Sequence, residues 1–192
     1  PGCYPTSIIT PLFPLFKNNY LKINKVIIDS KSGYSGAGRT ILKKEKKMNL
    51  FNSLTAYGIP NHRHNAEIYQ ELSFISKKIK FNFTPHIIPM FRGILSTIYV
   101  EKKNNISTEK ILNFLKRFYK KNKFVRICKK NMLIGTKNVI NTNYCDISVC
   151  ETNDKSRLVI LSAIDNLIKG GAGQAIQNLN IKFGFNIDEG LN

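Results

Sequence analysis

The spacing of apolar and polar residues predicts both strands and helices. Residues 94–100 alternate as a half-buried strand does. The face expected to be buried holds Ile94, Ser96, Ile98 and Val100. Residues 107–119 instead have helical spacing, and Ser107 is a residue type that caps helix N-termini. The expected apolar stripe of this helix is Ile111, Leu112, Leu115, Phe118 and Tyr119.

The remaining segments predict further strands and helices. The other strands are expected at 25–29, 81–83, 124–128, 144–151 and 158–163, and the other helices at 67–76 and 172–183. Residues 5–18 carry an apolar face interrupted by Pro11 and Pro14, so an irregular or short helix is expected there. Strands and helices do not alternate strictly. The sequence therefore predicts an α+β fold, with helices packed on a mixed, largely antiparallel sheet.

The composition is that of a globular protein with an unusual charge. Of the 192 residues, 42% are hydrophobic, and the formal net charge is +18. We find no signal-peptide pattern, and no apolar run approaches the roughly 18 residues that a membrane span needs. The charge is compatible with a nucleic-acid partner. However, lysine far outnumbers arginine, and Lys, Asn and Ile share A/T-rich codons, so compositional drift is the favoured explanation.

The four cysteines show no zinc-binding or disulfide spacing. We expect Cys128, Cys145 and Cys150 to be buried in strands and the protein to occupy a reducing compartment. Cys3 differs because it follows a glycine at the start of a helix. The unpaired N–H groups there stabilise a thiolate and an oxyanion, so a lowered pKa is expected and Cys3 should be the most reactive thiol.

His62-Arg63-His64 precedes a predicted helix. Two histidines alone are too few for a metal site, and we expect none. An imidazole instead suits the proton acceptor that a thiol nucleophile needs near neutral pH. A pair of ordinary surface histidines is the alternative.

Three segments that contain glycine are candidates for binding small anions or a nicotinamide. Residues 32–39 follow a predicted strand but lack the spacing of a dinucleotide fingerprint. Their glycines and serines still allow an anion to approach, with Arg39 as a clamp. Residues 83–93 form an expected Pro-rich connector that carries Arg92. Residues 165–174 end on a helix N-terminus, which suits a phosphate or an amide.

Five blocks of sequence together resemble one enzyme family. The blocks are PGCYPT (1–6), SGYSGAGR (32–39), HRHNAEI (62–68), FTPHIIPMFRGI (83–94) and IDNLIKGGAGQAIQNLN (164–180). In this order they resemble N-acetyl-gamma-glutamyl-phosphate reductases, which are related to aspartate-semialdehyde and glyceraldehyde-phosphate dehydrogenases. Asn65-Ala66 and Tyr34 depart from the family pattern. The resemblance implies the glyceraldehyde-phosphate dehydrogenase-like C-terminal fold without the N-terminal Rossmann half.

The resemblance implies that a cysteine thioester carries the reaction. N-acetyl-L-glutamyl 5-phosphate would be reduced by NADPH to N-acetyl-L-glutamate 5-semialdehyde, with release of phosphate, in arginine biosynthesis. Cys3 would be the nucleophile and His62 the acid–base, with His64 as the alternative and Glu67 in support. The substrate-binding candidates are Ser35, Arg39 and Arg92, and the cofactor-binding candidates are Asn166, Gly173, Gln174 and Asn178.

The resemblance also divides the chain and sets its expected partners. Residues 1–165 would form the catalytic and dimerisation domain, and residues 166–192 a helix that packs on the absent nucleotide-binding domain. The chain opens at Pro1 and is expected to be part of a longer protein. We expect a cytoplasmic homo-oligomer, a dimer or tetramer, without nucleic-acid or membrane partners. The alternatives are a related reductase of aspartyl or amino-adipyl phosphate, a basic nucleic-acid-binding protein, or an inert fragment.

Overall fold

The computed structural model describes residues 1–192 except 25, 38–51, 104–105 and 192. Its centre is a seven-stranded sheet with the strand order β2-β3-β1-β4-β7-β6-β5. The strands are β1 (Val26–Gly33), β2 (Thr55–Ala56), β3 (Phe81–Ile88), β4 (Ile94–Glu101), β5 (Val125–Ile127), β6 (Cys145–Glu151) and β7 (Arg157–Ile164). Only the pairs β1–β3 and β5–β6 are parallel, so the predicted mixed, largely antiparallel sheet is confirmed.

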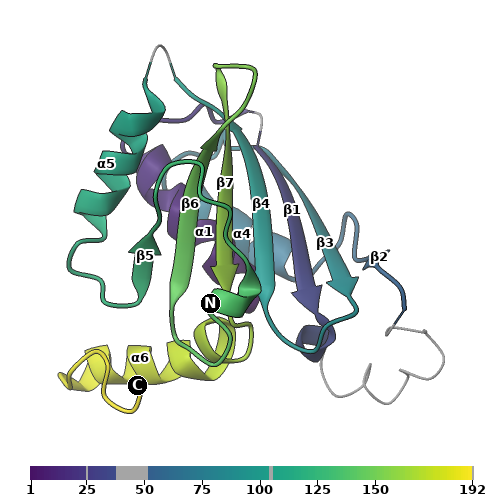
Figure 1. The fold of residues 1–192 in the computed structure, drawn as a ribbon, viewed down its shortest axis with the longest axis vertical. Coiled ribbons are helices and arrows are strands. Elements are labelled where there is room, and N and C mark those ends of the chain that lie inside the picture. The colour runs from purple at the N-terminus through teal and green to yellow at the C-terminus, as the bar shows by residue number, and fades with distance from the viewer. Residues whose placement is uncertain (25, 38–51, 104–105, 192) are drawn as a thin grey trace.

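Three helices cover one face of the sheet (Figure 1). They are α1 (Cys3–Lys17), α4 (His64–Ser73) and α5 (Thr108–Phe118), while α6 (Gly173–Phe183) lies beyond the ends of the strands. Three shorter turns connect these elements: η1 (Tyr34–Ala37), η2 (Thr136–Asn138) and η3 (Ile168–Ala172). The main core lies between the sheet and the covering helices. A smaller cluster of Ile134, Val139 and Ala163 lies apart from it.

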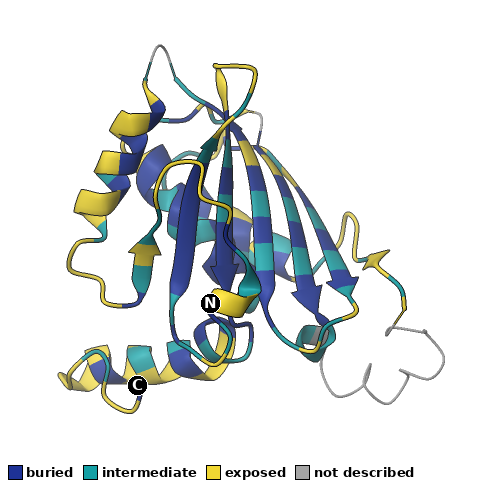
Figure 2. Ribbon diagram, viewed as in Figure 1, coloured by how far each residue is buried: buried dark blue, intermediate teal, exposed yellow. Residues whose placement is uncertain are grey.

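The two strongest sequence patterns are confirmed. Every second residue of β4, from Ile94 to Val100, is at most 2% exposed. Ser107 caps α5, because its hydroxyl accepts a hydrogen bond from the Lys110 amide at 3.2 Å. The expected stripe of α5 is buried through Leu115, but Phe118 is 43% exposed. Figure 2 shows the exposed outer side of this helix in yellow.

The prolines interrupt the structure less than expected. Helix α1 is continuous through Pro11 and Pro14. Pro14 cannot donate to the carbonyl of Thr10, but the Tyr119 hydroxyl donates to that oxygen instead, at 2.5 Å. The carbonyl group that the proline would leave unpaired is therefore satisfied by a side chain from beyond α5.

The expected connector at 83–93 is a strand over its first half, which corrects the sequence prediction. Strand β3 continues through Pro85 to Ile88. The carbonyl of Pro85 accepts from the Tyr57 amide at 3.1 Å, so the missing N–H of Pro85 faces the short edge strand β2 and not β1. Strand β1 likewise extends to Gly33, into the segment predicted as a loop.

Two of the three cysteines expected in the interior are only half-buried. Cys145 is fully buried in β6, whereas Cys128 and Cys150 keep partial exposure. Cys128 lies just beyond β5, near one edge of the sheet, and Cys150 lies near the end of β6. All four cysteines are free thiols.

Candidate active site

Cys3 is the first residue of α1. Gly2 precedes it in an extended conformation, and its carbonyl accepts the first helical hydrogen bond from the Thr6 amide at 2.9 Å. Burial raises the pKa of the Cys3 thiol, while the main-chain amides of Tyr4 and Cys3 act in the opposite direction. The lowered pKa expected from the sequence is therefore wrong for this structure, because the loss of solvent outweighs the helix terminus.

The turn η3 packs directly on Cys3. A Cβ added at Gly170 would lie 2.6 Å from the Cys3 Cβ and 3.0 Å from its Cα. Glycine at this position therefore lets the main chain approach the thiol residue. The amide of Gly170 in turn donates to the Asp165 carbonyl at 2.9 Å, which ties the turn to the end of β7.

Both imidazoles lie beside the start of α1. The rings of His62 and His64 are 5.0 Å apart, and each packs edge-on against the Tyr4 ring. A Cβ at Gly2 would overlap Nε2 of His64. In the described residues, no hydrogen bond joins the Cys3 thiol to either ring. The structure thus brings the predicted nucleophile and both candidate bases to one place.

The two histidines differ in exposure, but the pKa of each is lowered. His64 is 8% exposed, and burial, His62, Arg63 and the chain's ammonium group lower its pKa to about 4. His62 is half-buried, and burial and Arg63 lower its pKa as well. The amide of His64 donates to Nδ1 of His62 at 3.1 Å. Both rings are therefore neutral at pH 7. Because Nδ1 of His62 accepts from a main-chain amide, the ring hydrogen of neutral His62 lies on Nε2, which can donate it to a bound group.

Glu67 contacts the main chain before Cys3. Both of its carboxylate oxygens accept from the Gly2 amide, at 3.0 and 3.1 Å. Since Glu67 lies in the first turn of α4, this contact connects α4 to the start of α1. Glu67 thus holds the segment of the predicted nucleophile in place, one residue before the thiol.

A second cluster lies where η1 meets the end of β7. Asn166 is 4% exposed, its Nδ2 donates to the Ser35 hydroxyl at 3.0 Å, and its Oδ1 accepts from the Gly93 amide at 2.6 Å. Nε of Arg92 lies 3.3 Å from Oδ2 of the fully buried Asp165. The structure therefore brings Ser35, Arg92 and Asn166 together, while Arg39 lies outside the described residues.

The remaining cofactor candidates lie along α6. Gly173 is buried against Asn143, whereas Gln174 is half-buried and Asn178 is exposed. The Gln174 amide donates to Asn178 Oδ1 at 3.0 Å. These two amides are accessible to a ligand, but both ends of the Asn166 amide are already bonded within the chain. The candidate set is therefore split between one buried and two accessible amides.

Four residues near these clusters were not among the sequence candidates. Tyr57 donates to the Tyr4 hydroxyl at 3.2 Å, and burial raises the pKa of both phenols, so they stay protonated. Asp165 accepts from the amides of Leu167 and Ile168, a pattern that its position before a helical turn would have predicted. Arg63 is the fourth of these residues, and its position between the two histidines could have identified it from the sequence.

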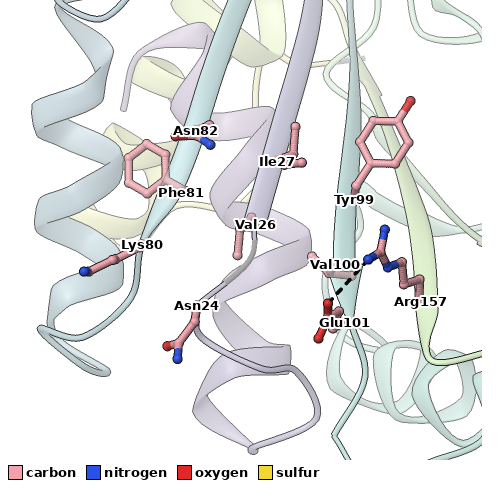
Figure 3. Close-up of a pocket in the computed structure, with 10 residues that line it drawn as sticks. All are labelled: Asn24, Val26, Ile27, Lys80, Phe81, Asn82, Tyr99, Val100, Glu101 and Arg157. Carbon is pink, nitrogen blue, oxygen red and sulfur yellow. Dashed lines mark ion pairs between the residues drawn. The ribbon is translucent and has the colours of Figure 1, made fainter.

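A separate pocket lies at the opposite end of the sheet (Figure 3). It has a volume of about 270 Å³ and is lined by the first residues of β1 and β3 and the last residues of β4. Arg157 and Glu101 form an ion pair of 3.8 Å within it. None of the candidate residues lines this pocket, so it does not contribute to the site around Cys3.

The described part of the chain has neither a cluster of metal-ligand side chains nor a membrane-spanning helix. No group of three His, Cys, Asp or Glu side chains there is placed to hold a metal ion. None of the described helices has the length and apolar character that crossing a membrane requires.

Comparison with known proteins identifies the family. Residues 3–166 match the family model "Semialdehyde dehydrogenase, dimerisation domain". N-acetyl-gamma-glutamyl-phosphate reductases from Desulforamulus reducens and Campylobacter jejuni subsp. doylei are 47% and 44% identical over the whole chain, which covers 56% of each. A probable chloroplastic N-acetyl-gamma-glutamyl-phosphate reductase of Arabidopsis thaliana is 44% identical, and the chain covers 48% of it. The chain thus spans about half the length of these relatives.

Solved structures show the same fold at low sequence identity. Aspartate semialdehyde dehydrogenase II from Vibrio cholerae superposes with a TM-score of 0.69 at 16% identity, over 95% of this chain and 61% of that one. Aspartate semialdehyde dehydrogenase from Francisella tularensis gives 0.71 at 16% identity, over 94% and 63%. With the architecture, the Cys3 cluster and the family match in agreement, this chain belongs to the semialdehyde dehydrogenase dimerisation-domain family.

Proposed function

We propose that this chain is the catalytic part of an NADPH-dependent N-acetyl-gamma-glutamyl-phosphate reductase of arginine biosynthesis. The reaction would reduce N-acetyl-L-glutamyl 5-phosphate to N-acetyl-L-glutamate 5-semialdehyde and release phosphate. The observation that carries the proposal is the position of Cys3 at the start of α1, beside two neutral imidazoles. The matches to proteins of this name extend over the whole of this chain, and they support the choice of substrate.

The first half of the reaction would form a thioester at Cys3. His62 would accept the thiol proton at Nδ1, which gives up its contact with the His64 amide, and the sulfur bonds to the acyl carbon while the bond from that carbon to the phosphate oxygen breaks. The electron pair leaves with the phosphate, which takes the proton from His62. The amides of Cys3 and Tyr4 act on the sulfur at the start of α1, and the same donors would stabilise the oxyanion formed during the attack. His62 is favoured over His64 because His64 is more buried.

The second half would require a nicotinamide near the thioester. A bound NADPH would supply the hydride for the thioester carbon, after which the aldehyde would leave and Cys3 would return to its thiolate form. The accessible amides of Gln174 and Asn178 fit the polar groups of such a cofactor. Asn166 fits better as a positioning residue, since it holds Ser35 and the Gly93 turn through both ends of its amide.

A substrate panel tests the proposed activity on the full-length protein. The protein should reduce N-acetylglutamyl phosphate with NADPH and release one phosphate per NADPH oxidised. Aspartyl phosphate and an amino-adipyl phosphate serve as comparison substrates, because the same chemistry on another side chain is the main alternative. Preference for either would assign the protein to a related reductase.

The part of the protein outside this chain would complete the cofactor site. We propose that residues 1–165 form the catalytic and dimerisation domain, and that 166–192 pack against a nucleotide-binding half. The apolar side chains of α6 and its C-terminal extension support this, because they are exposed and no described element covers them. They are Ile176, Leu179, Ile181, Phe183 and Phe185, at 38–67% exposure. Calorimetry should then detect NADPH binding by the full-length protein but not by residues 1–192.

The working enzyme would be a cytoplasmic homo-oligomer. The matched family is a dimerisation domain, and the sheet face opposite α1 exposes large side chains such as Ile27 (49%) and Tyr99 (45%). A reducing compartment suits a mechanism that depends on a free thiol at Cys3. Sedimentation of the full-length protein should show a dimer or tetramer; a monomer at micromolar concentration would contradict this part of the proposal.

A further inference from the structure

Arg63 differs from Arg92, Arg126 and Arg157 because no carboxylate among the described residues neutralises its charge. Arg92 pairs with Asp165, Arg126 with Asp146, and Arg157 with Glu101 and Asp154. Arg63 is exposed, and no carboxylate in the described part of the chain lies within ion-pair distance of it. Its guanidinium is therefore available for an anion from solution.

Arg63 also belongs to the cluster around the proposed nucleophile. It is the N-cap residue of α4, between the two histidines whose rings pack on Tyr4. Burial raises the pKa of Cys3, and the positive charge of Arg63 opposes this increase. Burial also raises the pKa of Tyr57, and Arg63 again opposes it. The charge of this side chain thus reaches the groups around the thiol, in addition to the two imidazoles.

We propose that Arg63 binds the phosphoryl group of the acyl phosphate beside Cys3, an inference that rests on the proposed function. The sulfur bonds to the acyl carbon, and one oxygen separates that carbon from phosphorus. The substrate carboxylate lies at the other end of the carbon chain. A cation close to the sulfur therefore meets the phosphoryl group and not the carboxylate. A guanidinium matches phosphate oxygens in shape and charge, and it stabilises the electron pair that leaves with phosphate.

This assignment gives Arg63 and Arg92 different roles. Arg92 is held by a buried carboxylate and by the Asn141 side chain, which suits a positioning residue. Arg63 has neither kind of restraint, and its side chain does not cap α4. Replacing Arg63 therefore removes no hydrogen bond that the described structure uses, and the loss of an anion site can be measured without unfolding α4.

The reverse reaction isolates the phosphate site. The full-length protein would oxidise the semialdehyde with NADP and inorganic phosphate, and NADPH formation reports the rate. Arg63→Gln should raise the KM for inorganic phosphate about 10- to 100-fold, the size of a lost charged hydrogen-bonding pair, and leave the KM for the semialdehyde nearly unchanged. Arg63→Lys should recover part of the loss, because it keeps the charge but not the two-pronged geometry. Arg117→Gln is the matched control, since Arg117 is exposed on α5.

A second measurement does not depend on turnover. Inorganic phosphate should slow the alkylation of Cys3 by iodoacetamide in the wild-type and Arg117→Gln proteins, but much less in Arg63→Gln. An active wild-type protein whose Arg63→Gln variant keeps the phosphate KM within twofold would overturn the role of Arg63 alone. A folded full-length protein without any phosphate-dependent activity would overturn the proposed function, and this inference with it.

Discussion

Burial has opposite effects on charge in two clusters: the one around Cys3, His62 and His64, and the one around Asp165, Arg92 and Asn166. At Cys3, burial raises the pKa of the thiol and lowers the pKa of both imidazoles, so the groups are neutral. At the end of β7, the fully buried Asp165 is instead paired with Arg92 and accepts from three main-chain amides. Groups that must gain and lose protons are kept uncharged, whereas a carboxylate that is surrounded by donors serves as a fixed anchor. The first cluster is thus suited to chemistry and the second to positioning.

Replacing the nucleophile should have the largest effect. In the full-length protein, Cys3→Ser should lower turnover by at least about 10⁴-fold, because the thioester can no longer form. Steady-state NADPH oxidation measures this loss. Cys150→Ser is the matched control, since Cys150 is half-buried near the end of β6. Comparable losses in both variants would remove the distinction between Cys3 and the other thiols.

The next largest effect should be the difference in turnover between variants of the two histidines. His62→Asn should lower turnover by about 10²–10⁴-fold, the usual size for a lost acid–base group. His64→Asn should have a smaller effect on turnover, because His64 is more buried and its pKa is about 4. Turnover of both variants across pH 5–9 is the measurement. A larger loss in His64→Asn would reverse the assignment.

Replacing the anchor residue Asp165 should mainly lower the stability of the protein. Asp165→Asn should lower the free energy of unfolding by about 2–3 kcal/mol, because Arg92 loses its partner and buried amides lose a charged acceptor. Urea denaturation of the chain measures the change. Asp188→Asn is the control, since Asp188 pairs with Lys123 at the surface, and its denaturation midpoint should not move. Equal midpoints for Asp165→Asn and the wild type would show that the second cluster is not an anchor.

The smallest effect should be the pH dependence of stability that arises from His64. Its pKa is lowered from 6.5 to about 4, so the unfolded chain binds a proton more readily than the folded one. Stability should therefore be greatest above pH 6.5 and fall by about 2 kcal/mol as the pH is lowered towards 4. Denaturation of the wild type and of His64→Gln at pH 7 and pH 4.5 measures this term. The same decrease in both proteins would assign it to other groups.

The structure changes the expected rate at which Cys3 is alkylated. The sequence predicts that Cys3 is the most reactive thiol, but the structure half-buries Cys3 and its pKa is raised. In residues 1–192 alone, alkylation of Cys3 should therefore be slow at pH 7 and accelerate above pH 9. Peptide mapping after limited iodoacetamide treatment would show the order of labelling. Rapid labelling of Cys3 at pH 7 would mean that the helix terminus outweighs burial after all.

The sequence by itself determined the elements whose local pattern and tertiary environment agree. The alternation in 94–100, the Ser107 cap and the helix near 172–183 are all present, because side-chain period and capping chemistry act over a few residues. The resemblance carried by five motifs also identified the family and the mixed sheet. These motifs bring Cys3, His62 and His64 into one list of candidates, although they lie about 60 residues apart.

Only the tertiary structure decided features that depend on distant partners. Pro14 remains within α1 because Tyr119, about a hundred residues later, donates to the carbonyl that the proline leaves unpaired. The pKa of Cys3 is raised because η3 and α4 remove solvent from it, which the local helix-terminus argument did not include. Asp165 separates the proposed roles of Arg92 and Arg63, since it engages the Arg92 guanidinium, whereas no described carboxylate pairs with Arg63. Burial and charge pairing are properties of the assembled fold, and local sequence patterns do not contain them.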